Sequence, residues 1–261
     1  MAAALSHFTM VGFDVDISNA TAFRISTSKY MQNCETIALD STDTLCRIKD
    51  KSGAELWIGV RREGRDSFSL MSANPALAGT GKASVVIGGD VSDPAEKPFE
   101  ISISAHFAGD KVPIVFDLAD ARDAATLKPG TKATVDIAAF SFEPYIFADE
   151  AAYAKSQAGA KVRFAPNFFI PSGSFFESAG GTMPKDANNP QAYADFAGTV
   201  LQAELRTNAA GGSQYWWASV RTYADATFDV IMDPKTVKTD PKPGSIVSGR
   251  FWLSARVAAA P

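Results

Sequence analysis

The sequence predicts a mostly-β protein of the α+β class, on three observations. The chain has 18 Phe among 261 residues, and so many aromatic side chains favour a core of strands over a helical bundle. Apolar and polar residues alternate along many short segments, most regularly over residues 100–107, as half-buried strands require. Clusters of Gly, Pro, Asn and Asp separate these segments and supply turns.

The first 75 residues predict a β-α-β-β-β order. Residues 8–15 are typical of a strand, and the Ser-Asn pair at 18–19 can cap a helix that ends near Asn33. Further strands are expected at residues 44–49, 56–60, 67–72 and 83–88. Residues 1–90 therefore form an N-terminal α+β portion.

The rest of the chain predicts two β portions joined by a structured loop. Residues 91–165 contain the first, residues 191–261 contain the second, and the Pro-, Gly- and Phe-rich residues 166–190 connect them. A helix is predicted at 149–157, where acids stand at the start and a Lys near the end. Strands are expected at 100–107, 114–118, 134–142, 198–206, 215–223, 227–232 and 246–257. All portions can pack as one compact body.

Two segments of the chain share one pattern. A Phe-Asp pair stands at 116–117 and again at 228–229, and a Lys-Pro-Gly turn with a following hydroxyl residue comes later, at 128–131 and 242–245. In both segments a strand ends in an acid, a loop follows, and the turn begins a long strand. The pattern indicates an internal duplication, while the alternative is that common turn chemistry recurs by chance.

The order of elements near the C-terminus resembles an OB-fold barrel. A long strand, a hairpin, a loop and a Pro-Gly turn into a last strand follow one another over residues 196–257, and less completely over 99–147. The helix that such barrels usually place before the fourth strand is reduced to the loop at 234–243. The resemblance implies one or two small OB-like antiparallel barrels that bind a ligand on a strand face, with no built-in chemistry.

Charge and composition argue against several classes of partner. The formal net charge is -4 and the pI is about 5.3, which disfavours a general attraction to nucleic acid or to an anionic membrane. No apolar run approaches the length that spans a bilayer, and residues 1–7 lack the regions of a signal peptide. Cys34 and Cys46 are too few for a disulfide framework. We therefore expect a soluble, cytoplasmic protein with reduced thiols.

The sequence predicts no catalytic residue, metal site or cofactor. His106 lies on the polar face of a predicted strand, and His7 lies in a terminal segment expected to fray. Residues 79–84 are similar to a phosphate-binding loop, but Ala83 replaces the hydroxyl residue and a strand follows where a helix is needed. The N-terminal element order is also similar to that of the vicinal-oxygen-chelate enzymes, whose His and Glu ligands hold a metal. Because only His7 could be such a ligand, an enzyme is the third class of function that we consider.

One predicted strand face stands out from the others. Side chains alternate along residues 215–223 and 250–257, and one side of each strand is apolar. The other side combines two Trp, two Tyr and three Arg, which are the residue types that stack on ligands and dominate interfaces. This aromatic-arginine face consists of Tyr215, Trp217, Arg221, Tyr223, Arg250, Trp252 and Arg256.

Three interpretations of the aromatic-arginine face are open. It can pack against the N-terminal half or the Phe-rich loop at 166–176, form an interface with a partner protein or a second copy, or bind a small molecule or single-stranded nucleic acid. Residues 191–261 hold seven Lys and Arg against six Asp and Glu, which is too small an excess for phosphate-driven binding. The sequence predicts a non-enzymatic binding or protein-interaction protein, with single-stranded nucleic-acid binding as the alternative.

Overall fold

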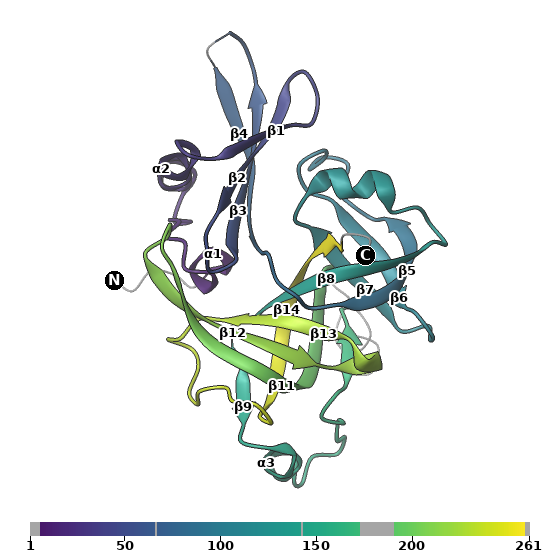
Figure 1. Ribbon diagram of the computed structural model, residues 1–261. Coiled ribbons are helices and arrows are strands. Elements are labelled where there is room, and N and C mark those ends of the chain that lie inside the picture. The colour runs from purple at the N-terminus through teal and green to yellow at the C-terminus, as the bar shows by residue number, and fades with distance from the viewer. Residues whose placement is uncertain (1–5, 66, 142, 173–190, 259–261) are drawn as a thin grey trace.

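The computed structural model of the chain describes residues 6–65, 67–141, 143–172 and 191–258 and confirms the mostly-β class. A four-stranded antiparallel sheet projects from one side of a closed eight-stranded barrel (Figure 1). Most of the structured loop predicted at 166–190 lies outside the described residues.

The N-terminal part of the chain forms the sheet and two helices. The sheet order is β1-β2-β3-β4, with every pair antiparallel. The elements are α1 (His7–Met10), α2 (Ala20–Met31), β1 (Glu35–Ala38), β2 (Asp43–Lys49), β3 (Ala54–Arg62) and β4 (Phe68–Leu77).

The remaining strands build the barrel and two short additions at its wall. The barrel strands are β5 (Ala83–Asp90), β6 (Ser102–Phe107), β7 (Pro113–Leu118), β8 (Lys132–Ser141), β11 (Tyr193–Asn208), β12 (Ser213–Arg221), β13 (Thr227–Met232) and β14 (Ile246–Val257). The additions are β9 (Tyr145–Phe147) and β10 (Phe169–Pro171), and the connecting helices are η1 (Ala121–Thr126), α3 (Glu150–Ser156) and η2 (Tyr223–Asp225). The strand at 83–88 thus pairs within the barrel and not within the N-terminal sheet.

The strand predicted at residues 8–15 is wrong, because the chain begins a one-turn helix there. Ser6 and Thr9 form a capping box: the Thr9 backbone N–H donates to Ser6 Oγ at 3.4 Å, and the Ser6 backbone N–H donates to Thr9 Oγ1 at 3.2 Å. Gly12, at a φ of +76°, then turns the chain under the β11–β12 hairpin, where a Cβ would lie 2.6 Å from the Ser213 carbonyl oxygen. The apolar spacing of this segment therefore serves burial and not strand pairing.

Both predicted helices are confirmed, and a side chain caps the start of each. Asn19 accepts a hydrogen bond from the Ala22 backbone N–H at 2.9 Å at the start of α2. Asp149 does the same for Ala152, at 2.7 Å, at the start of α3. A side chain that satisfies a free amide at a helix start stabilises that start by about 1 kcal/mol, which explains why these boundaries could be predicted.

Each four-strand unit of the barrel is a Greek key, in which the fourth strand returns to lie beside the first. The spatial order is β8-β5-β6-β7 in the first unit and β14-β11-β12-β13 in the second. β8 and β14 also pair with each other, β7 runs parallel to β14, and β13 runs parallel to β8. Each unit therefore closes into a five-strand circuit that includes the last strand of the other unit.

The two segments that share a sequence pattern occupy equivalent places in these units. Asp117 of β7 is in register with Ser254 of β14, and Asp229 of β13 is in register with Ala138 of β8. Ser254 and Ala138 are in turn partners in the β8–β14 ladder. The units are thus related by an approximate twofold arrangement, the geometry that a duplicated unit would adopt.

Two apolar clusters hold these parts together. The larger cluster fills the barrel, and among its members are Phe107, Phe116, Phe196, Phe228 and Phe251. The second lies between the outer wall of the barrel and the sheet, and it includes Met10, Leu56, Ile58, Tyr215, Trp217 and Trp252. The sheet therefore covers the wall of the barrel that β12 and β14 form, and this decides which side chains of those strands reach solvent.

Candidate functional site

The aromatic members of the predicted face lie inside the protein. Trp217 and Trp252 are each only 7% exposed, and Tyr215 is fully buried. Their polar atoms are satisfied internally: Trp217 Nε1 donates to Asp229 at 2.6 Å, and Trp252 Nε1 donates to Asp117 at 2.6 Å. These three side chains join the barrel to the sheet.

Arg256 also belongs to this junction. Glu55, 2% exposed on β3, accepts hydrogen bonds from Arg256 Nη2, from Trp57 Nε1 at 2.9 Å, and from Arg47 at 2.6 and 3.2 Å. One buried carboxylate therefore compensates two guanidinium groups. Desolvation lowers the pKa of Arg256 to about 10, because burial disfavours the charged form.

The other three members of the predicted face are separated from one another. β12 ends at Arg221, which is exposed. The 3-10 turn η2 then begins at Tyr223, so the alternation of the strand does not continue to this residue. The ring of Tyr223 packs on Phe107 instead, with 5.5 Å between ring centroids. Arg250, with 72% of its side chain exposed, reaches solvent on another wall of the barrel.

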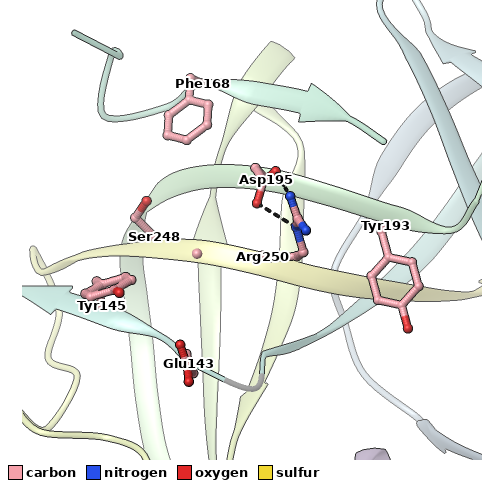
Figure 2. A pocket seen from close by; sticks show the side chains of 8 residues that line it. Glu143, Tyr145, Phe168, Tyr193, Asp195, Ser248 and Arg250 are labelled. Atoms are coloured by element: carbon pink, nitrogen blue, oxygen red, sulfur yellow. Dashed lines mark hydrogen bonds and ion pairs between the residues drawn. The ribbon is translucent and has the colours of Figure 1, made fainter. Parts of the chain in front are cut away.

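Arg250 lines an open groove with a cavity volume of about 480 Å³ (Figure 2). β14 forms the floor, since it pairs with β11 on one side, where Asp195 is opposite Arg250, and with β9 on the other, where Tyr145 is opposite Ser248. Gly249 has no side chain to project from this floor, and a Cβ there would lie 3.2 Å from the Glu143 carbonyl oxygen. The groove is lined by Glu143, Tyr145, Phe168, Tyr193, Asp195, Ser248, Gly249 and Arg250.

The groove combines aromatic rings with an uneven distribution of charge. Tyr145 and Phe168 lie toward one end and Tyr193 toward the other (Figure 2). Between them Arg250 donates two hydrogen bonds to the Asp195 carboxylate, at 3.1 and 3.0 Å, and this pairing raises the pKa of Arg250. Among the described residues, no Lys or Arg forms an ion pair with the exposed Glu143. Among the described residues that line the groove, the charge of Glu143 is therefore the one without an ion pair.

A second cavity lined by several carboxylates is too small for a drug-sized ligand. Its volume is about 70 Å³, and Glu96, Glu100 and Asp117 line it. Burial raises the pKa of Glu100 and of Asp117. Asp117 accepts a hydrogen bond from Ser102 Oγ at 2.5 Å in addition to that from Trp252. A cavity of this size holds only a few waters, and we assign it a structural role.

The loop that is similar to a phosphate-binding loop surrounds a carboxylate of the protein itself. The backbone N–H groups of Thr80 and Gly81 donate to Asp229 Oδ2 at 2.7 and 2.6 Å. A Cβ on Gly79 would lie 2.0 Å from the same oxygen. The glycines thus permit a close approach to an anion, as they do in phosphate loops, and here the anion is Asp229.

His7 does not lie in a frayed terminus, as the sequence analysis expected. It begins α1, and its ring centroid is 4.6 Å from that of Trp252. α1 also replaces the first strand of the β-α-β-β-β order, so the similarity to vicinal-oxygen-chelate enzymes loses its first element. In the part of the chain that the structure describes, no three His, Cys, Asp or Glu side chains are close enough together to hold a metal ion.

The packing of His7 predicts a pH-dependent stability. Desolvation lowers its pKa from 6.5 to about 4, so the unfolded chain binds a proton at pH 5 and the folded chain does not. The free energy of unfolding should therefore fall as the pH drops from about 6.5 to about 4. We expect His7→Gln to lose less stability than the native chain over this range in urea denaturation. An unchanged difference between the two proteins at pH 7 and pH 5 would contradict the packing of His7.

Sequence reasoning found one residue of the groove and missed the rest. Tyr193 and Asp195 share a face of β11, a spacing that is visible in the sequence, but their place opposite Arg250 depends on the β11–β14 register. Tyr145 lies on β9, whose three residues are too few for alternation to be recognised. The groove is therefore formed by tertiary contacts, and a pattern in the sequence does not reveal it.

Comparison of the sequence with protein-family models found no match, and comparison with curated proteins found no relative. No helix within the described residues is long and apolar enough to cross a membrane. The groove geometry is thus the observation from which a function can be argued.

Proposed function

We propose that the chain is a non-enzymatic binding protein that recognises its partner through the groove between β9, β14 and β11. The observation that carries this proposal is the groove itself, an open cavity of about 480 Å³ with three aromatic side chains and a few polar groups. Ligand sites in proteins commonly have 300–1,000 Å³ and this mixture of apolar walls with few polar groups.

The architecture supports a binding role. Each five-strand circuit is closed and contains a Greek key, and a five-stranded Greek-key barrel is the architecture of the OB-fold. We propose that the two circuits are OB-like barrels that exchange their last strands. Barrels of this kind use an outer strand face and neighbouring loops to bind ligands, and the groove lies on such a face.

Substitution of Tyr145 tests the groove. Tyr145 is 59% exposed and Phe68, on the projecting sheet, is 61% exposed, so Ala at either position should leave the fold intact. We expect a ligand from a panel of short peptides, sugars and oligonucleotides to shift the amide resonances of Ser248–Arg250 in NMR spectra. Tyr145→Ala should weaken this ligand about tenfold, and Phe68→Ala should not.

Two results of this experiment would contradict the proposed function. In one, no member of the panel shifts the groove resonances. In the other, a ligand binds but its affinity is equal in Tyr145→Ala and in the native chain, which would place the binding surface elsewhere.

Single-stranded nucleic acid is the alternative ligand, because three rings in one groove can stack on bases. Charge opposes it: Glu143 and Asp195 outnumber Arg250, and phosphate contacts require uncompensated cations. An oligothymidylate in the same panel separates the two ideas. Salt-sensitive binding of this oligonucleotide at Ser248–Arg250 would favour the nucleic-acid function.

A further inference from the structure

We propose that the groove receives an arginine side chain of a protein partner, which packs on Tyr145 and pairs with Glu143. This inference rests on the proposed function, since it names the ligand of the same groove. It is supported by an arrangement that recurs within the chain, by the charge of the groove, and by the geometry of its β9 edge.

Guanidinium groups of this protein repeatedly pack over an aromatic ring while they pair with a carboxylate. The combination brings together a cation–π contact and a charge-assisted hydrogen bond, which reinforce each other at partly dry sites. Three examples are Arg206 over Trp217 (3.9 Å) with Glu204 (2.9 Å), Arg47 over Trp57 (4.8 Å) with Glu55 (2.6 Å), and Arg61 over Phe99 (5.4 Å) with Asp43 (2.7 Å).

The groove presents the ring and the carboxylate of this arrangement without the cation. Glu143 and Tyr145 are two residues apart, both are exposed, and both line the groove at its β9 edge (Figure 2). Within the described ranges, no guanidinium or ammonium group lies over the Tyr145 ring or pairs with Glu143. A cation supplied from outside the chain would complete the set.

Arg250 does not complete this set itself. Its guanidinium is held by the Asp195 carboxylate on the β11 side of the floor, so its charge is already compensated. The uncompensated charge of the groove is then that of Glu143. A negative groove attracts a cationic side chain and repels phosphate or carboxylate ligands.

Arginine fits this site better than lysine. Its guanidinium is planar and weakly hydrated, so it can stack on Tyr145 and still direct two N–H groups to one carboxylate. The ring of Phe168 offers a second apolar surface at the same end of the groove (Figure 2). An ammonium group makes neither the planar stack nor the bidentate pair, so lysine should bind more weakly.

Four blocked tripeptides test the assignment with the full chain. They are acetyl-Gly-X-Gly-amide with Arg, Lys, Gln or Glu as X, and a neutral disaccharide and an oligothymidylate serve as comparison ligands. We expect the Arg peptide to shift the Ser248–Arg250 amide resonances at the lowest concentration, the Lys peptide to need several-fold more, and the Gln and Glu peptides to shift nothing. Added salt should weaken the binding of the Arg peptide, because salt screens the charge of the exposed Glu143.

Charge removal in the groove supplies the matched control. Glu143→Gln should lower the affinity for the Arg peptide at least about fivefold. Glu63 is an exposed acid in the β3–β4 turn, and Glu63→Gln should leave this affinity unchanged. Equal affinity of the Arg peptide for Glu143→Gln and the native chain would overturn the proposal.

The remaining outcomes separate the ligand class from the function. If the Gln peptide, the disaccharide or the oligonucleotide shifts the groove resonances more strongly than the Arg peptide, the arginine assignment is wrong and the groove keeps its binding function. If no probe shifts these resonances at any concentration, the arginine proposal is wrong and the proposed function loses its support as well.

Discussion

Replacement of Glu55 by Gln should lower the free energy of unfolding by about 3–5 kcal/mol, the cost typical of removing one partner from a buried ion pair. Arg47 and Arg256 both depend on the charge of this carboxylate. The substitution preserves shape and removes that charge, so Arg256 loses its ion-pair partner and Arg47 keeps only the half-exposed Glu35, at 3.9 Å. Urea denaturation of the purified variant measures the loss directly.

Asp14→Asn is the matched control for this prediction. Asp14 pairs with Lys29 at 3.2 Å, but 74% of its side chain is exposed, and an exposed ion pair contributes only about 0–1 kcal/mol. If Glu55→Gln were no more destabilising than Asp14→Asn, the junction between sheet and barrel would not depend on this buried cluster.

The two equivalent aspartates should respond differently to the same change. Within the described ranges, the hydrogen-bond donors to Asp229 are the N–H groups of Thr80, Gly81 and Trp217. An Asn there must turn its own NH2 toward one of these donors, which leaves buried polar groups unpaired. We expect Asp229→Asn to lower the free energy of unfolding by about 2–4 kcal/mol.

Asp117→Asn provides the comparison, because one of its two partners can change its role. The hydroxyl of Ser102 can accept a hydrogen bond from the Asn NH2, while Trp252 Nε1 donates to the Asn oxygen. We expect a change within about 1 kcal/mol. Urea denaturation of both variants measures the contrast, and equal losses would contradict the hydrogen-bond assignment at Asp229.

Local signals predicted most elements of this fold. Asn19 and Asp149 cap helices by contacts within one turn, and the strands of the barrel alternate along their own length, so each is legible without knowledge of the rest of the chain. The apolar residues at 8–15 were misleading. There the apolar residues are buried by other elements, and the capping box of Ser6 selects a helical turn.

The candidate site was less predictable, because exposure is decided by tertiary contacts. The sequence correctly separates the two sides of β12, since Ala218 lies inside the barrel and Trp217 outside it. The sequence does not reveal that the N-terminal sheet covers Trp217 and leaves Arg250 exposed to solvent. A strand face that is outside its own barrel can still be inside the protein.

Hydroxyl-radical footprinting of the native chain tests the central claim, that the aromatic-arginine face is a junction and the groove is the accessible binding surface. Trp217 and Trp252 should be oxidised slowly despite their high intrinsic reactivity, and Tyr145 should be oxidised rapidly. Addition of acetyl-Gly-Arg-Gly-amide should protect Tyr145 and leave Phe68 unchanged. Rapid oxidation of Trp217 and Trp252, together with slow oxidation of Tyr145, would contradict the account.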